Sequence, residues 1–296
     1  MQLNLTALSA ELESAVENAG TMVVAVHGRT RTPSSGVFWR DGVIVTNEHS
    51  LKREDEVALT LPDGSQGTAT LAGRDPGTDL AVLKTTAKGV AAKTGAPPKA
   101  GHLVLALGRS PNSGVNAAMG IVSAVSGPWR TWRGGQMDAY VRLDVTLFAG
   151  SWGGPVVTPE GVVIGVSTGV LSRVAPLAVP TATVDRVVDD LLSKGRVSRG
   201  FLGVGLQPVR VPEALRLHAG SDSGVIVLSV EPGGPADSAG VFIGDVLVSL
   251  NGQTLADIDD VQTALDGGTI GKQMTVKVLR GGQPVEFAVT VGERRA

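Results

Sequence analysis

The sequence predicts a mostly β protein with two domains. Its 296 residues suffice for one large core or two modest ones. The chain holds 40 glycines, about twice the usual share, and only 3% of its residues are aromatic. Short runs rich in Val and Thr alternate with Asp-Gly and other Gly-rich turns, a pattern typical of strands joined by tight hairpins.

Composition excludes several classes of function. The formal net charge is −2 at pH 7, so the chain has no general attraction for nucleic acid or anionic lipid. It contains no cysteine, which excludes disulfides and thiolate metal sites. The four histidines are far apart in sequence and form no local ligand pair, so we expect no metal; they are His27, His49, His102 and His218. We also expect no cofactor and, from the net charge, no nucleic-acid partner.

The amino terminus has no basic region followed by an apolar stretch, so no signal peptide is expected in this sequence. Nowhere do eighteen apolar residues follow one another, and we therefore expect no membrane span. The composition predicts a soluble chain. It leaves open that the sequence is a trimmed form of a longer secreted precursor.

The first third of the chain predicts one helix and then strands. Apolar residues recur at helical spacing over residues 6–18, with Thr6 or Ser9 as the N-cap and Gly20 as the end. The elements expected after it are a strand over 22–27, a polar turn over 29–35, a hairpin over 36–46 about Asp41-Gly42, and a hairpin over 57–71 about Asp63-Gly64.

The middle of the chain predicts a second set of strands. A Pro-containing segment over residues 89–101 is expected to cross between two β-barrels, and the expected strands are 102–108, 120–125 and 139–144. Residues 127–135 form a loop with two Trp and two Arg. Such a loop suits stacking on single-stranded nucleic acid, but the favoured interpretation is that the tryptophans pack on the barrel while the arginines stay solvated.

The stretch Gly150-Ser-Trp-Gly-Gly-Pro155 is expected to form a tight turn, because glycine alone adopts the required dihedral angles cheaply. Such a turn leaves backbone amides pointing inward, as in an oxyanion hole. The amides expected to form the hole are those of Gly150, Ser151 and Trp152.

This turn resembles the Gly-Asn-Ser-Gly-Gly-Pro loop of the trypsin-like serine proteases of the HtrA (DegP-type) family. The alignment has no gap, and it puts Ser151 at the Asn position and Trp152 at the nucleophile. Two further runs resemble the family's histidine and aspartate motifs. They are Gly42-Val-Ile-Val-Thr-Asn-Glu-His49 and Arg74-Asp-Pro-Gly-Thr-Asp79-Leu-Ala-Val-Leu-Lys84. A lone histidine is more often packed or solvated than catalytic, but the order His49, Asp79, nucleophile loop is that of chymotrypsin-type enzymes.

The resemblance extends to the rest of the chain. It implies a chymotrypsin/trypsin-like double β-barrel over residues 1–198 and a C-terminal PDZ domain over residues 199–296. At the end of the first domain, an apolar stripe predicts a helix over 183–195 that Gly195 ends; the stripe is Val184, Val187, Val188, Leu191 and Leu192. Backbone pairing with a substrate peptide would then fall to Val166, Ser167 and Thr168. A C-terminal carboxylate would be bound by the loop Phe201, Leu202, Gly203 and Val204. In the PDZ region we expect strand, turn and short helix over 225–240, then hairpins over 244–252 and 274–282 on either side of a helix over 257–265.

Trp152 at the nucleophile position implies lost or altered chemistry, because an indole offers no hydroxyl for His49 to deprotonate. The first hypothesis is a pseudoprotease that binds extended or C-terminal peptides of unfolded or partner proteins. The second is an active endopeptidase of protein quality control that uses Ser151 with His49 and Asp79. The third treats Trp152 as a substituted position in an otherwise ordinary protease.

The resemblance also implies a location outside the cytoplasm, periplasmic or secreted, and a trimer. The family's trimers are held by aromatic residues near the amino terminus, and this chain has none before Phe38.

Overall fold

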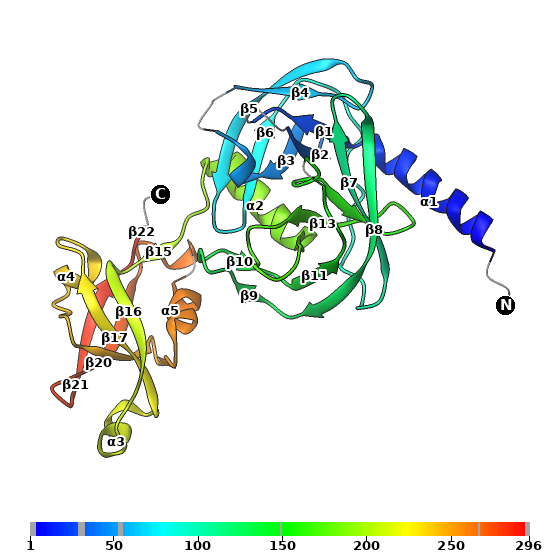
Figure 1. Ribbon diagram of the computed structural model, residues 1–296. Helices are drawn as coiled ribbons and strands as arrows, with labels where there is room; N and C mark the ends of the chain where they lie inside the picture. Colours follow the sequence, from blue (N-terminus) through cyan, green and yellow to red (C-terminus); the bar gives the residue numbers. More distant parts are fainter. Residues whose placement is uncertain (1–3, 29–32, 53–55, 149, 266, 294–296) are drawn as a thin grey trace. The chain divides into compact units, whose positions relative to one another are not determined.

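The computed structural model describes residues 4–28, 33–52, 56–148, 150–265 and 267–293. The chain divides into two compact units, Met1–Val197 and Ser198–Ala296. The first unit contains two closed six-stranded barrels and the second a twisted sheet with short helices (Figure 1). The predicted fold class is therefore confirmed. Within the described ranges, no helix combines the length and the apolar character that a membrane crossing needs.

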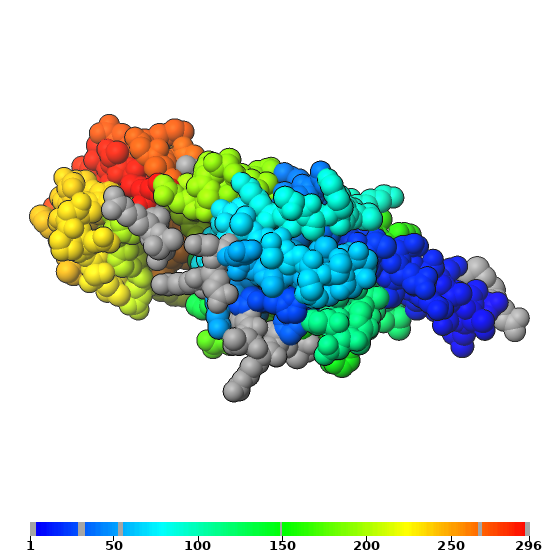
Figure 2. Space-filling view, turned by 90° about the horizontal axis from the view of Figure 1, so that it is seen from above, coloured from blue at the N-terminus to red at the C-terminus, as the bar shows by residue number. Residues whose placement is uncertain are grey.

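Helix α1 (Leu5–Gly20) begins at Asn4, whose side chain accepts hydrogen bonds from the amides of Thr6 (3.1 Å) and Ala7 (3.2 Å). Asn4 is therefore the N-cap, in place of the expected Thr6 or Ser9. Only the carboxyl-terminal half of α1 is well buried, through Ala15, Ala19 and Gly20. In two perpendicular views the rest of the helix extends beyond the barrels (Figures 1 and 2).

The first barrel has the strand order β1-β2-β3-β6-β5-β4. Both expected Asp-Gly hairpins are present, one between β2 and β3 and the other between β4 and β5. Of the expected polar turn, residues 29–32 lie outside the described residues, while Ser34 and Ser35 belong to β2. The strands are β1 (Val23–Val26), β2 (Ser34–Arg40), β3 (Val43–Asn47), β4 (Glu56–Thr60), β5 (Gln66–Asp75) and β6 (Leu80–Lys84), with a 3-10 turn η1 (Glu48–Ser50) after β3.

The second barrel has the order β11-β14-β13-β12-β7-β8. Its longest strand, β8, contains the expected strand 120–125 and pairs with both β7 and β11. The strands are β7 (Leu103–Ser110), β8 (Gly114–Ser126), β11 (Tyr140–Asp144), β12 (Pro155–Val157), β13 (Val163–Thr168) and β14 (Leu177–Pro180); a two-stranded hairpin, β9 (Trp129–Arg130) with β10 (Gln136–Met137), precedes β11.

The largest core cluster joins the two barrels with helices α1 and α2 (Thr181–Lys194). The apolar stripe predicted for the second of these helices is buried except for Leu192, which is partly buried, and Gly195 ends the helix with a φ of 71°. Val45 of the first barrel and Leu107 of the second belong to this cluster. The core therefore lies between the barrels as well as inside each.

The second unit is a sheet of order β16-β17-β18-β20-β21, with β19 paired to β18 and a separate β15–β22 pair. Its elements are β15 (Gly200–Phe201), β16 (Val204–Arg210), η2 (Glu213–Leu215), α3 (Arg216–Ala219), β17 (Ser223–Val230), α4 (Pro235–Ser238), β18 (Val246–Leu250), β19 (Gln253–Thr254), α5 (Ile258–Ala264), η3 (Gly267–Thr269), β20 (Gln273–Arg280), β21 (Gln283–Thr290) and β22 (Gly292–Glu293).

An ion pair between a buried aspartate and a partly exposed arginine stabilises this second unit. The side chain of Asp245 is 2% exposed and accepts hydrogen bonds from Arg280 Nε (2.8 Å), Arg280 Nη2 (2.7 Å) and the Phe242 amide (2.8 Å). The Arg280 guanidinium also lies over the rings of Phe242 and Phe287. Burial opposes ionisation of Asp245, but the hydrogen bonds from Arg280 and Phe242 outweigh it and lower its pKa.

This lowered pKa predicts an acid-sensitive second unit. The contribution of the Asp245 carboxylate is present above the ordinary Asp pKa and is lost as the pH falls through the folded-state pKa. At neutral pH, Asp245→Asn is expected to lower the free energy of unfolding by about 1.5–3 kcal/mol, measured by native-state hydrogen exchange of β18 and β20 amides. The variant is also expected to lose part of the acid dependence, whereas the exposed control Asp222→Asn keeps it. Identical acid dependence in Asp245→Asn and the parent chain would contradict this account.

Candidate active site

Asp79 lies at the end of a tight turn between β5 and β6. Within the turn, the Asp75 carboxylate accepts hydrogen bonds from the Gly77 amide (3.1 Å) and the Thr78 hydroxyl (2.7 Å). Asp79 itself has a φ of 57°, in the left-handed region that few non-glycine residues adopt. Because β6 pairs with β3, with Leu80 opposite Asn47, the turn lies beside the segment that carries His49.

His49 and Asp79, thirty residues apart in sequence, are directly hydrogen bonded. His49 Nδ1 lies 2.8 Å from Asp79 Oδ1 and 2.9 Å from Oδ2, and the His49 amide donates to Oδ1 (3.1 Å). The Thr168 hydroxyl donates to Oδ2 (2.6 Å). Asp79 is 0% exposed and the His49 side chain 26%. Since the carboxylate accepts at Nδ1, that nitrogen carries the proton, and Nε2 is the nitrogen able to take a proton from a nucleophile.

The β9–β10 hairpin contacts the Asp79 turn from outside. The buried Thr131 hydroxyl donates to Gly77 O (2.7 Å) and accepts from the Gly135 amide (3.0 Å). Trp129 packs edge-on against Tyr140, as expected for the tryptophans of this loop. Trp132 differs from that expectation, because it is 72% exposed with the Arg133 guanidinium over its ring. Thr131 therefore joins this loop to the Asp79 turn, and the Gly135 backbone packs against the same turn.

The turn after Phe148 has the tight geometry that its glycines predict. Gly150 and Gly153 have φ values of 94° and 83°. A Cβ at Gly153 would lie 2.5 Å from Ser35 O, and one at Gly154 would overlap the carbonyl of Leu107. Only glycine fits between these backbones. The turn is further held by hydrogen bonds from the Ser35 amide to Trp152 O (2.9 Å) and from the Gly153 amide to Ser167 O (3.1 Å).

Two of the three amides expected in an oxyanion hole are available. Among the described residues, the amides of Gly150 and Trp152 have no hydrogen-bond partner. The Ser151 amide, which the sequence analysis grouped with them, donates instead to Phe148 O (3.0 Å) within the turn. An oxygen bound here would therefore meet the amides of Gly150 and Trp152.

The Ser151 side chain faces the second barrel. It is 4% exposed, and its hydroxyl donates to Asn116 Oδ1 (3.1 Å) on β8. A Cβ at Gly108 on β7 would lie 2.9 Å from this hydroxyl. The hydroxyl is thus directed at the β7–β8 hairpin, while Nδ1 of the His49 imidazole is hydrogen bonded to Asp79.

The Trp152 side chain is partly buried and packs on the chain just after β13. A Cβ at Gly169 would lie 2.6 Å from Cη2 and 2.8 Å from Cζ3 of the indole. The six-membered ring therefore rests on the Gly169 backbone, in space that any larger residue at 169 would take.

The expected substrate-pairing residues need a correction. Val166 already pairs with Pro155 on β12 and with Val179 on β14. Ser167 exchanges backbone hydrogen bonds with Gly153 and Gly154 on one side and pairs with Ala178 on the other. Neither Val166 nor Ser167 has a backbone edge left for a peptide. Thr168, the third expected residue, uses its side chain to hold Asp79, a role that its sequence context did not indicate.

A buried arginine connects α1 with the turn. Arg109 is 8% exposed, and burial lowers its pKa from the ordinary value. Its side chain donates to Val23 O (2.6 Å) and to Gly20 O (2.9 Å) at the end of α1. Its amide donates to the Ser35 hydroxyl (2.9 Å), which in turn donates to Gly150 O (2.6 Å).

In the second unit, the predicted carboxylate-binding loop joins β15 to β16. Leu202 O and Gly203 O accept hydrogen bonds from the amides of Ala236 (2.8 Å) and Glu231 (2.7 Å), which fixes the loop. Phe201 pairs with Gly292, and Val204 begins β16. Among the described residues, strand β16 lies at the edge of its sheet, where it pairs with β17 alone, and it contacts α5. Its other edge is open to an added strand.

No cluster of three or more His, Cys, Asp or Glu side chains able to hold a metal ion occurs in the part of the chain that the structure describes.

Comparison with known families assigns both units. Residues 34–166 match the family described as trypsin-like peptidase domain, and residues 200–291 match the PDZ domain family. The chain is a homologue of the DegP and HtrA-type serine proteases. A protein of Brucella suis named probable periplasmic serine endoprotease DegP-like is 36% identical over 276 residues, which cover 90% of this chain and 53% of the relative. The chain thus spans about half the length of this relative.

Solved structures of HtrA homologues agree over almost the whole chain. The serine endoprotease from Yersinia pestis is 28% identical, with a TM-score of 0.79 over 96% of this chain and 98% of that one. The HtrA-type protease AlgW, solved with a decapeptide, is 26% identical, with a TM-score of 0.80 over 96% of this chain and 99% of that one.

The contact between Trp152 and Gly169 predicts a strong coupling between these positions. Gly169→Ala is expected to lower the free energy of unfolding by about 1–3 kcal/mol, because the added methyl group overlaps the indole ring. In a Trp152→Ser background the same change should cost little, since the ring is gone. Urea unfolding of the four chains in this double-mutant cycle measures the coupling. Equal costs of Gly169→Ala in both backgrounds would place the indole elsewhere.

Proposed function

We propose that this HtrA homologue binds extended or C-terminal peptides of unfolded or partner proteins and is catalytically impaired. The proposal rests on the assignment of Trp152 to the nucleophile position of the glycine turn. Its indole contacts Gly169, directly after the residue that holds Asp79. With that assignment, the oriented His49–Asp79 pair and the amides of Gly150 and Trp152 would serve a position that carries no hydroxyl.

In this proposal His49 and Asp79 are the remains of a catalytic triad, and the amides of Gly150 and Trp152 are the oxyanion-hole donors. The indole also takes space next to Gly169, so it would hinder the binding of a substrate side chain. The substrate's peptide bond would in addition stay uncleaved. The alternative, Ser151 acting as nucleophile, would require its hydroxyl to leave Asn116 and turn toward His49.

The PDZ domain would supply the peptide-binding site. A peptide would add a strand to the open edge of β16, beside α5, and its carboxylate would meet the loop Phe201–Val204. A related protein, the HtrA-type protease AlgW, has been solved with a decapeptide. We assign residues 1–198 to the protease-like domain and residues 199–296 to the PDZ domain.

Relatives named periplasmic endoproteases support a location outside the cytoplasm for this chain as well. The trimer implied by the family resemblance stays a prediction, because the single chain does not test it.

Incubation with fluorescently labelled unfolded casein tests the impaired site. The parent chain is expected to bind casein without cleaving it, as is Ser151→Ala. Trp152→Ser returns a hydroxyl to the place served by His49 and should raise cleavage at least about 100-fold over the parent, because a missing nucleophile costs about 10⁴-fold or more.

The matched control is Trp152→Ala, which removes the indole without supplying a nucleophile and should stay inactive. Cleavage by the parent chain that disappears in Ser151→Ala would overturn the proposal in favour of Ser151. Cleavage by the parent chain that survives Ser151→Ala would show that neither assignment is right.

A further inference from the structure

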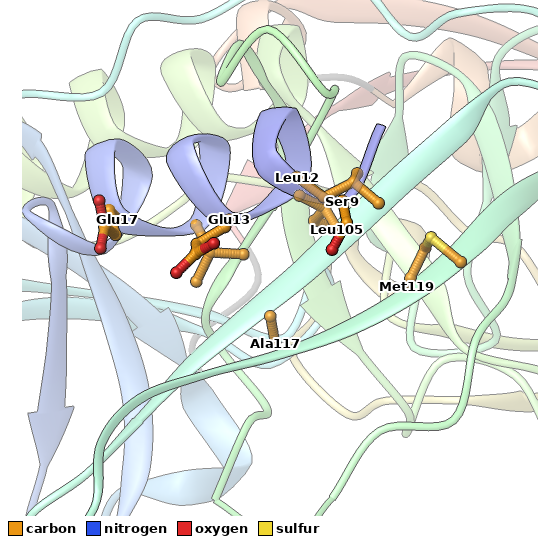
Figure 3. Close-up of a pocket in the computed structure, with 8 residues that line it drawn as sticks. Ser9, Leu12, Glu13, Glu17, Leu105, Ala117 and Met119 are labelled. Atoms are coloured by element: carbon orange, nitrogen blue, oxygen red, sulfur yellow. The ribbon is translucent and has the colours of Figure 1, made fainter. Parts of the chain in front are cut away.

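A groove runs between α1 and the outer face of strands β7 and β8. The helix is docked at its carboxyl end, where a Cβ at Gly20 would lie 3.2 Å from Val115, while Leu5 near the other end is 70% exposed (Figures 1 and 2). The groove has a volume of about 430 Å³, within the usual range for ligand sites. It is lined by Ser9, Leu12, Glu13, Val16, Glu17, Leu105, Ala117 and Met119 (Figure 3).

The floor of the groove is apolar. Leu12 and Val16 come from the helix and pack at the edge of the main core, and the buried Leu105 comes from β7. Met119 on β8 is 58% exposed, and Figure 3 shows it beside Ala117 on the strand side of the groove. A flexible thioether on an apolar floor suits partners of varied shape.

The helix side of the groove carries two acidic side chains that do not stabilise α1. Glu13 and Glu17 are one turn apart on the helix, where like charges repel. Glu17 lies in the last turn, where a negative charge also opposes the helix dipole. Among the described residues, neither carboxylate has an ion pair or a hydrogen bond. The whole helix, Leu5–Gly20, contains no Lys, Arg or His.

We propose that this groove binds a basic amphipathic peptide segment, in which Lys or Arg side chains alternate with Leu-like ones. The apolar side chains would contact Leu12, Val16 and Met119, while the cations would pair with Glu13 and Glu17. The negative charge of Glu13 and Glu17 favours a basic peptide over the other possible occupants, a second copy of α1 or an anionic lipid surface. A second copy of α1 would bring Glu next to Glu, and an anionic lipid surface would be repelled.

This site is separate from those of the proposed function. Its lining residues belong to α1, β7 and β8, and none lies in the turn 150–155 or in the second unit. Binding here can therefore be measured whether or not Trp152 impairs catalysis.

Fluorescence anisotropy with a labelled peptide of about 12 residues, built from Lys and Leu at helical spacing, tests the site in the full chain. The peptide is amidated at its carboxyl end, so that the loop Phe201–Val204 has no carboxylate to bind. The parent chain is expected to bind it with an affinity that falls as salt is added. A twin peptide with Glu in place of Lys should not bind.

The double variant Glu13→Gln and Glu17→Gln keeps the shape of the groove and relieves repulsion within the helix, so it should fold normally. It is expected to bind the Lys peptide roughly tenfold more weakly and with less salt dependence. The matched control, Glu11→Gln with Glu56→Gln, removes the same charge outside the groove and should bind as the parent does. Met119→Ser should also weaken binding by about 3- to 10-fold.

Equal affinity of the parent and the Glu13/Glu17 variant, or equal binding of the Lys and Glu peptides, would overturn the proposal. So would sedimentation that shows a concentration-dependent dimer abolished by Met119→Ser, because the groove would then be occupied by a second copy of the chain.

Discussion

The close backbone contact of Gly153 and Gly154 with both barrels is the constraint on which the candidate site depends. Ser35 of the first barrel and Leu107 of the second leave no room for a side chain at these two residues. Hydrogen bonds from Ser35 to Trp152 and from Gly153 to Ser167 fix the turn from both sides. The backbone of residue 152 is therefore held in one place whatever side chain it carries, and in this chain that side chain is an indole.

The His49–Asp79 pair has a structural role that does not depend on a nucleophile. A fully buried carboxylate is costly unless charged or polar groups satisfy it. Asp79 accepts from the imidazole, from the His49 amide and from Thr168, and so links three distant segments of the first unit. Removing His49 would leave a buried charge with fewer partners. The hydrogen bond from Thr168 to Asp79 thus joins β13 of the second barrel to the first barrel, and the presence of the His49–Asp79 pair alone is no evidence of catalysis.

Local signals in the sequence predicted much of this structure. The Asp-Gly pairs identified two hairpins, helical spacing identified α1 and α2, and the motifs around His49 and Asp79 identified two side chains that are hydrogen bonded in the structure. The predictions that failed depend on strand register between distant segments. Thr168 reaches Asp79, and Val166 and Ser167 lose their free edges, because of how β13 pairs with β12 and β14.

The contacts of Arg109 and Ser151 could likewise not be predicted from the sequence, because they join segments that are distant in it. Arg109 reads as an ordinary polar residue at the end of a strand, yet it is buried and joins the end of α1 to Ser35 and so to Gly150. Because neighbouring side chains diverge in a turn, Ser151 and Trp152 contact different parts of the structure. Asn116, the partner of the Ser151 hydroxyl, lies 35 residues away on β8, and only the fold brings the two together.

Intact-mass spectrometry after treatment with a serine-reactive phosphonate tests the central claim most directly. If Trp152 has replaced the nucleophile and the Ser151 hydroxyl stays with Asn116, the mass of the parent chain should remain unchanged, while Trp152→Ser should gain one adduct. A single adduct on the parent chain, mapped to Ser151, would contradict the account and show that the turn presents its nucleophile one residue earlier.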